Sequence, residues 1–165
     1  MEKKGSVTVP VDINAVARDA IRLADLERDE RIALRTSFFN PLPQVSGSPA
    51  QLVRAFVSLL VNARESLAGV GGGVIDVETE PDGDLVAIRI LDNGPGMSQD
   101  LLERIFDPFD CAEAPRESGD GKEPPEIVGL SVACEILRDH SGTLTVRSRR
   151  GEGTCIVALI PTLRG

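Results

Sequence analysis

A long amphipathic segment with well-marked ends constrains the fold most. Ser48 can cap a helix, Pro49 suits its first position, and Gln51 stands three residues after the cap. The predicted helix runs to about Ala68 and ends in Gly69. One face of it carries the apolar side chains Leu52, Phe56, Leu59, Ala63 and Leu67. A helix with one apolar face must be covered by another layer, so the chain is expected to fold into at least two layers.

The rest of the chain supplies further helices and several hairpins. Strands are predicted at 6–11, 32–38, 74–80, 85–91, 143–149 and 154–160, and further helices at 12–28, 99–105 and 127–138. Pro81-Asp82-Gly83 and Arg150-Gly151-Glu152-Gly153 are hairpin turns. The predicted fold class is α+β: a two-layer α/β sandwich with a mostly antiparallel mixed sheet, covered on one face by three main helices. We expect a single domain over 1–165, with its core at 11–161 and one long loop at 107–126.

Composition narrows the classes of function. The chain of 165 residues has 26 acidic and 18 basic residues, a net charge of −8, and a pI near 4.7, which argues against nucleic-acid binding. No apolar run is long enough to cross a bilayer, and no apolar segment follows the first lysines, so a cytoplasmic domain without membrane contact is expected. Three widely spaced cysteines and a single histidine make a zinc site improbable.

A polar stripe runs beside the apolar face of the helix at 48–68. Ser58, Asn62 and Ser66 are spaced four residues apart, and Glu65 lies close by. One interpretation is a solvated flank of the helix. The other is a ligand wall, in which the Asn62 side-chain carbonyl faces a phosphate or a cation such as Mg²⁺, because a polar side chain beside a core needs a partner.

A second candidate site lies at the end of the strand at 85–91. Val86, Ile88, Ile90 and Asp92 share one strand face, so a carboxylate continues an apolar row. This carboxylate needs a hydrogen-bond donor: either a local backbone N–H, as in an Asx turn, or the amine of a bound base. The glycines of Gly94-Pro95-Gly96 allow a flat ligand to approach the backbone.

Three segments in this order resemble a known family. Leu59-Leu60-Val61-Asn62-Ala63-Arg64-Glu65-Ser66-Leu67, Asp92-Asn93-Gly94-Pro95-Gly96-Met97 and Arg104-Ile105-Phe106-Asp107-Pro108-Phe109 resemble the N, G1 and F boxes of the ATP-binding domain of sensor histidine kinases. That domain belongs to the superfamily that includes DNA gyrase B, Hsp90 and MutL. The resemblance covers about 11–161 and implies a Bergerat-type ATPase sandwich.

The resemblance implies the following roles. Asp92 accepts a hydrogen bond from the adenine amine, Gly94 and Gly96 let the base approach, and Asn62, with Ser58 one turn earlier, coordinates Mg²⁺. The residues implied to bind ATP are Asn62, Glu65, Ser66, Asp92, Gly94, Gly96, Met97, Phe106, Gly129 and Leu130. No residue is assigned as catalytic. Phe106 and Phe109 anchor a lid over 107–126.

The implied partners lie outside this segment. In such kinases the γ-phosphoryl group of ATP goes to a histidine on a separate dimerisation domain, and a response regulator follows. The full-length proteins can be dimeric.

Three features depart from the family pattern. Ser58 stands where many members have an asparagine or an acidic residue. Pro125-Glu126-Ile127-Val128-Gly129-Leu130 stands where a glycine-rich box is typical, so Glu126 and Ile127 are expected to weaken phosphate binding. The only histidine, His140, is expected to complete the last turn of a helix, not to accept phosphate.

These departures leave three hypotheses. The chain is the ATP-binding catalytic domain of a two-component sensor histidine kinase. Alternatively, it is a degenerate member with weak or no ATP turnover that acts through protein–protein interaction. A third class is a stand-alone kinase that phosphorylates serine or threonine on a regulatory partner.

Overall fold

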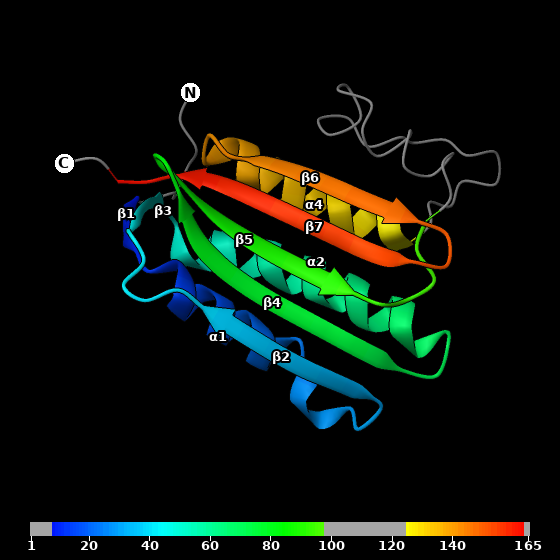
Figure 1. Cartoon of the computed structure of the whole chain (residues 1–165). Coiled ribbons are helices and arrows are strands. Elements are labelled where there is room, and N and C mark those ends of the chain that lie inside the picture. Colours follow the sequence, from blue (N-terminus) through cyan, green and yellow to red (C-terminus); the bar gives the residue numbers. More distant parts are fainter. Residues whose placement is uncertain (1–7, 98–124, 164–165) are drawn as a thin grey trace.

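Helices cover one face of a five-stranded mixed sheet in the computed structural model, which describes residues 8–97 and 125–163 (Figure 1). The strand order is β2 (Ile32–Phe38), β4 (Gly73–Asp82), β5 (Leu85–Asp92), β7 (Gly153–Pro161) and β6 (Thr143–Arg149). β2 and β4 are parallel, and the other neighbours are antiparallel. The helices are α1 (Ile13–Leu23), α2 (Pro49–Ala68) and α4 (Pro125–Asp139). The predicted two-layer sandwich is therefore confirmed.

The long helix α2 has the predicted ends. The Ser48 hydroxyl accepts a hydrogen bond from the Gln51 N–H at 3.3 Å, Pro49 occupies the first turn, and Gly69 caps the end. All five predicted core residues of this helix are buried, together with Ala55 and Leu60. None of the helices in the described part of the chain is long and apolar enough to cross a membrane.

The first helix is shorter than predicted. α1 ends at Leu23, Asp25 adopts a left-handed conformation with φ 62°, and a short 3-10 helix η1 (Leu26–Arg28) follows. A helix continued to residue 28 would turn Leu26 away from the core, whereas the break buries it completely. Arg64 of α2 donates to the Ala24 carbonyl at 2.6 Å, which satisfies a backbone group that the end of α1 leaves free.

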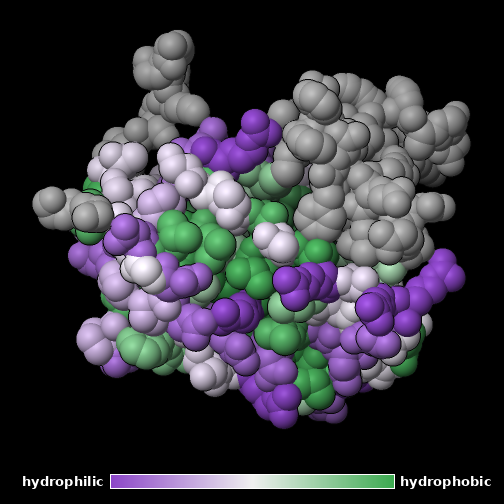
Figure 2. Space-filling view, turned by 45° about the horizontal axis from the view of Figure 1, so that its top comes forward, coloured by the Kyte–Doolittle hydropathy of each residue, from purple (hydrophilic) through white to green (hydrophobic). Residues whose placement is uncertain are grey.

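The sheet alternates between a core face and an uncovered face. Ile75, Val77, Ile88 and Ile90 point to the helices and are buried. The uncovered face carries partly exposed apolar side chains, including Leu91, Val157 and Leu159. Figure 2 shows an apolar area in the middle of one face, surrounded by polar side chains.

Two strand predictions differ from the structure. The predicted edge strand at 6–11 is described only as β1 (Val9–Val11), and it does not join the main sheet. It pairs in antiparallel with β3 (Val45–Gly47), a short strand that was not predicted. Two such short strands carry little periodic signal of their own.

The predicted loop at 107–126 also differs at its end. α4 begins at Pro125, so residues 125 and 126 belong to the helix. The remainder of this loop, the predicted helix at 99–105, and Phe106 and Phe109 lie outside the described residues.

His140 links the end of α4 to the start of α2. Its Nε2 accepts a hydrogen bond from the Ser48 N–H at 3.1 Å, and its Nδ1 lies 2.9 Å from the Ile136 carbonyl. Because Nε2 acts as an acceptor, Nδ1 carries the proton and donates it to that carbonyl. The predicted helix-end role is confirmed, and the histidine also fixes α2 against α4.

Candidate functional site

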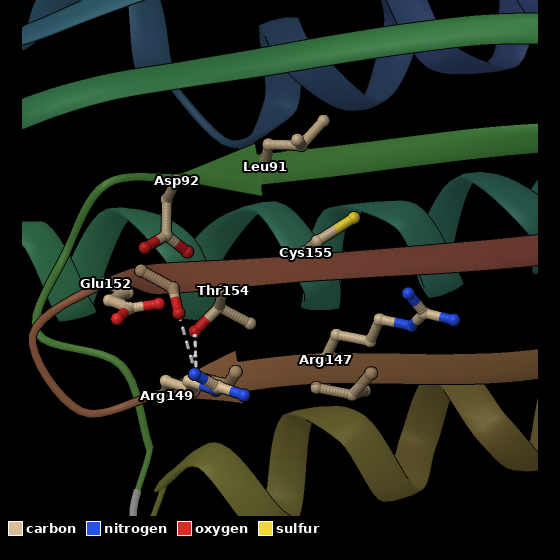
Figure 3. Close-up of a pocket in the computed structure, with 10 residues that line it drawn as sticks. Leu91, Asp92, Arg147, Arg149, Glu152, Thr154 and Cys155 are labelled. Atoms are coloured by element: carbon tan, nitrogen blue, oxygen red, sulfur yellow. Dashed lines mark hydrogen bonds between the residues drawn. The ribbon is translucent and has the colours of Figure 1, made fainter.

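A pocket of about 630 Å³ lies on the sheet where β5 and β6 end and β7 begins (Figure 3). Leu91, Arg147 and Cys155 of the uncovered face line it together with Asp92, Ser148 and Thr154, and none of the described residues of α2, α4 or the segment 94–97 does. Asp92 is paired with Thr154 across β5 and β7, and Thr154 is paired with Ser148 across β7 and β6. The three side chains therefore form one polar row that continues the core face of the sheet.

Asp92 is a half-buried carboxylate with a local partner. The Gly94 N–H donates to its Oδ1 at 2.8 Å, which is the Asx turn predicted from the sequence. Burial raises the pKa of Asp92 above its ordinary value of 3.8, and the Gly94 hydrogen bond opposes that shift. A carboxylate that is costly to bury, with acceptor capacity left over, is suited to a ligand that donates hydrogen bonds.

Gly94 sits where a side chain would not fit. A Cβ at this position would lie 2.9 Å from the Asp92 Oδ1 and 3.0 Å from the Ser66 hydroxyl. The structure thus brings Ser66 of α2 next to Asp92 and Gly94. Asn62 lies one turn before Ser66 on the same stripe, and both are half-buried.

Ser58, the other predicted metal ligand, lies further along this stripe. It lines a separate groove of about 730 Å³ between α1 and α2, together with Leu23, Val53 and Val57. Neither Ser58 nor Asn62 nor Ser66 lines the pocket at the ends of β5 and β6. Among the described residues, no cluster of three or more His, Cys, Asp or Glu side chains is placed to hold a metal ion.

The end of the G1 segment is fixed to the β6–β7 hairpin. Gly96 has φ +78° and packs so tightly against the Arg149 carbonyl that no side chain fits. The Gly151 N–H donates to the Pro95 carbonyl at 2.7 Å, and the Met97 N–H donates to the Ser148 hydroxyl at 2.8 Å. The β6–β7 hairpin therefore fixes the position of residues 95–97.

Ser148 and Thr154 were missed by the sequence analysis. Thr154 is 7% exposed, and its hydroxyl lies 2.9 Å from that of Ser148. The alternation of the two strands could have identified them, because both polar residues occupy core-facing positions, two residues away from Val146 and Ile156.

The other predicted site residues have different surroundings. Glu65 is exposed on α2, and Met97 is 7% exposed in the core. Leu130 is 1% exposed and packs in the core from α4. Gly129 lies in α4, and Phe106 lies outside the described residues. These residues remain predicted ligand contacts.

Comparison with known families gives one match over most of the chain. The family described as histidine kinase-, DNA gyrase B- and HSP90-like ATPase matches residues 47–164. The sensor histidine kinase ZraS of Escherichia coli (strain K12) is 30% identical over 152 residues, which are 92% of this chain and 30% of that protein. Sporulation kinase E of Bacillus subtilis (strain 168) is 29% identical over 150 residues, 90% of this chain and 19% of that protein. The chain thus spans less than a third of these relatives.

Solved structures share the fold. The mycobacterial sensor histidine kinase MprB superimposes with a TM-score of 0.73 at 24% identity, covering 96% of this chain and 100% of that chain. A nucleotide-free catalytic domain of the histidine kinase ThkA superimposes with a TM-score of 0.74 at 23% identity, covering 98% of this chain and 99% of that one.

Proposed function

Since the chain belongs to the family of histidine kinase-, DNA gyrase B- and HSP90-like ATPases, we propose that it binds ATP beside Asp92, between the end of the sheet and α2. We propose further that it is the catalytic domain of a two-component sensor histidine kinase. In that role it presents the γ-phosphoryl group to a histidine on a separate dimerisation domain, and a response regulator then receives it. The full-length protein is proposed to be dimeric and the domain cytoplasmic.

The observation that carries the proposal is the surroundings of Asp92. Its carboxylate is half-buried, accepts one local hydrogen bond from Gly94, and stands beside Thr154 at the end of the core-facing row of the sheet. The glycine at position 94 keeps space open beside the carboxylate that a Cβ would fill. An exocyclic amine is a ligand group that such a carboxylate recognises.

The proposed metal ion is Mg²⁺, bound together with the phosphates of the nucleotide. Asn62 offers a side-chain oxygen on the stripe that leads to Ser66 and Gly94, and Mg²⁺ bound with a nucleotide needs only one or two protein oxygens. The ion would neutralise phosphate charge. Ser58 is a weaker candidate, because it lines the groove between α1 and α2. The protein's own contribution is to position and orient the bound triphosphate.

Calorimetry tests the proposal directly. ATP should bind with one-to-one stoichiometry and more tightly in Mg²⁺, and Asn62→Ala should remove most of the Mg²⁺ dependence. Thr145→Ala, at an exposed position of β6, serves as a control because it also replaces a polar side chain by alanine. The absence of heat at millimolar ATP would reject the proposal.

A second candidate is a degenerate domain with weak ATP turnover that acts by protein–protein interaction. The specific observation is that α4 already begins at Pro125, so the sequence in the place of the glycine-rich box is helical and includes Ile127. Ile127→Gly would then tighten ATP binding, and the unmodified chain would not phosphorylate a supplied dimerisation domain. Phosphohistidine formed on that domain excludes this candidate, and phosphoserine formed on a partner protein would instead identify a serine kinase.

A further inference from the structure

Ser148 makes more hydrogen bonds than its position on an edge strand would require. It lies on β6, the last strand of the described sheet, and its Oγ contacts three different groups. The Met97 N–H donates to it at 2.8 Å, the Gly153 carbonyl lies 2.9 Å away, and the Thr154 hydroxyl also lies 2.9 Å away. These contacts join the end of the G1 segment to both strands of the hairpin.

Only one arrangement of protons satisfies all three contacts. A serine hydroxyl has one proton to donate and two lone pairs to accept. The Gly153 carbonyl can only accept, so Ser148 must donate its proton there. The Thr154 hydroxyl must therefore donate to Ser148, whose second lone pair is used by the Met97 N–H. Every hydrogen-bonding position of Ser148 is then occupied.

This arrangement determines what the Thr154 hydroxyl can offer to a ligand. Its proton points at Ser148, so only its lone pairs remain for other partners. Asp92, its register partner on β5, also presents an acceptor. Two neighbouring strands thus present acceptors side by side at this end of the sheet.

We propose that Ser148 is a positioning residue that sets base selectivity: it orients the Thr154 hydroxyl as an acceptor and holds the backbone of Met97 against the hairpin. The proposal rests on the proposed function. An amine at this edge of a base donates to the acceptors, directly or through a water molecule, whereas a carbonyl there meets only lone pairs. Ser148 therefore favours ATP over inosine triphosphate, which carries a carbonyl in place of the amine.

The test compares ATP and inosine triphosphate by calorimetry in five variants of the full chain. In Ser148→Ala the Thr154 proton is released and can donate to a carbonyl, so the preference for ATP should fall about fivefold. Ser148→Thr keeps the hydroxyl and should restore the preference. Thr145→Ala, at an exposed position on the same strand, should leave it unchanged.

Thr154→Val distinguishes positioning from a direct role of Ser148. This variant removes the hydroxyl that stands beside Asp92 and should lower the preference by a similar factor. If Ser148 acts through Thr154, adding Ser148→Ala to Thr154→Val should lower the preference no further. The proposal would be overturned if the losses of preference in Ser148→Ala and Thr154→Val multiply in the double variant. It would also be overturned if Ser148→Ala leaves the preference unchanged.

Amide hydrogen exchange at Met97 separates this proposal from the proposed function. The Met97 amide should exchange faster in Ser148→Ala and stay protected in Thr154→Val, whether or not nucleotide is present. A wild-type chain that binds neither nucleotide would overturn the proposed function and the selectivity role. Equal Met97 exchange in wild type and Ser148→Ala would overturn the holding role even if ATP binds well.

Discussion

Asp92→Asn should change ligand binding and stability in opposite directions. Asparagine has nearly the same shape, and its side-chain oxygen can still accept the hydrogen bond from the Gly94 N–H. What is lost is the negative charge that would accept from a base amine. A hydrogen bond to a charged group contributes about 1.5–3 kcal/mol, so the Kd for ATP should rise about 10- to 150-fold.

Stability should change in the other direction. Because burial raises the pKa of Asp92 in the folded state, ionising this carboxyl costs more in the folded than in the unfolded chain. The wild-type chain therefore loses stability as pH rises from 3.8 through the raised pKa. Asp92→Asn removes this cost, so its free energy of unfolding without ligand should exceed that of wild type at pH 7. The difference should disappear below pH 3.8.

Calorimetric titration with ATP and thermal unfolding between about pH 3 and pH 7 measure the two effects. Asp82→Asn is the matched control, because Asp82 is exposed at the opposite end of β4. An Asp92→Asn variant that binds ATP as tightly as wild type would refute the role of the charge. A variant less stable than wild type at pH 7 would refute the argument from burial.

Three further substitutions test the framework of the site. Gly96→Ala should destabilise the domain by about 2 kcal/mol or more in denaturant unfolding, because φ is +78° and the Arg149 carbonyl leaves no space for a Cβ. An unchanged free energy of unfolding would contradict the close packing. Asn14→Ala should lower the free energy of unfolding in denaturant by about 2–4 kcal/mol, because the Asn14 amide bonds both the Phe39 carbonyl and the Thr79 hydroxyl in a buried network. A change within experimental error would show that water replaces the Asn14 side chain. His140→Ala should lower the free energy of unfolding by about 1–3 kcal/mol and leave the ATP affinity in calorimetry unchanged, because the ring bonds only the backbone of α2 and α4. Loss of ATP binding in a folded variant would contradict this role.

The parts of the fold that local signals determine could be predicted. The ends of α2 follow from Ser48, Pro49 and Gly69, each of which acts on its own backbone. The hairpin turn before Gly153 follows from glycines that adopt positive φ. The strand at 32–38 has the predicted bounds, because it begins with the apolar residues 32–34 and is followed by Asn40 and Pro41, which end it.

Features that depend on contacts distant in sequence could not be predicted. The end of α1 depends on Arg64, forty residues away, and on the burial of Leu26. β3 is defined only by its pairing with β1. Each is set by tertiary packing, which overrides the local helical and strand patterns.

The same distinction applies to the candidate site. The sequence identified Asp92 and Gly94, because a carboxylate at the end of an apolar strand face and a glycine two residues later form a local motif. It did not identify Ser148 and Thr154, because their role depends on the contact between the hairpin and the G1 segment. Polar residues in a core-facing register were the only sign of them.

The most direct test of the central claim is a crystal structure of the chain with a non-hydrolysable ATP analogue and Mg²⁺. The account predicts the adenine amine within hydrogen-bonding distance of the Asp92 carboxylate, beside Thr154, with the phosphates extending along α2 toward Asn62. A pocket filled by the protein's own side chains, or a base bound away from Asp92, would contradict it.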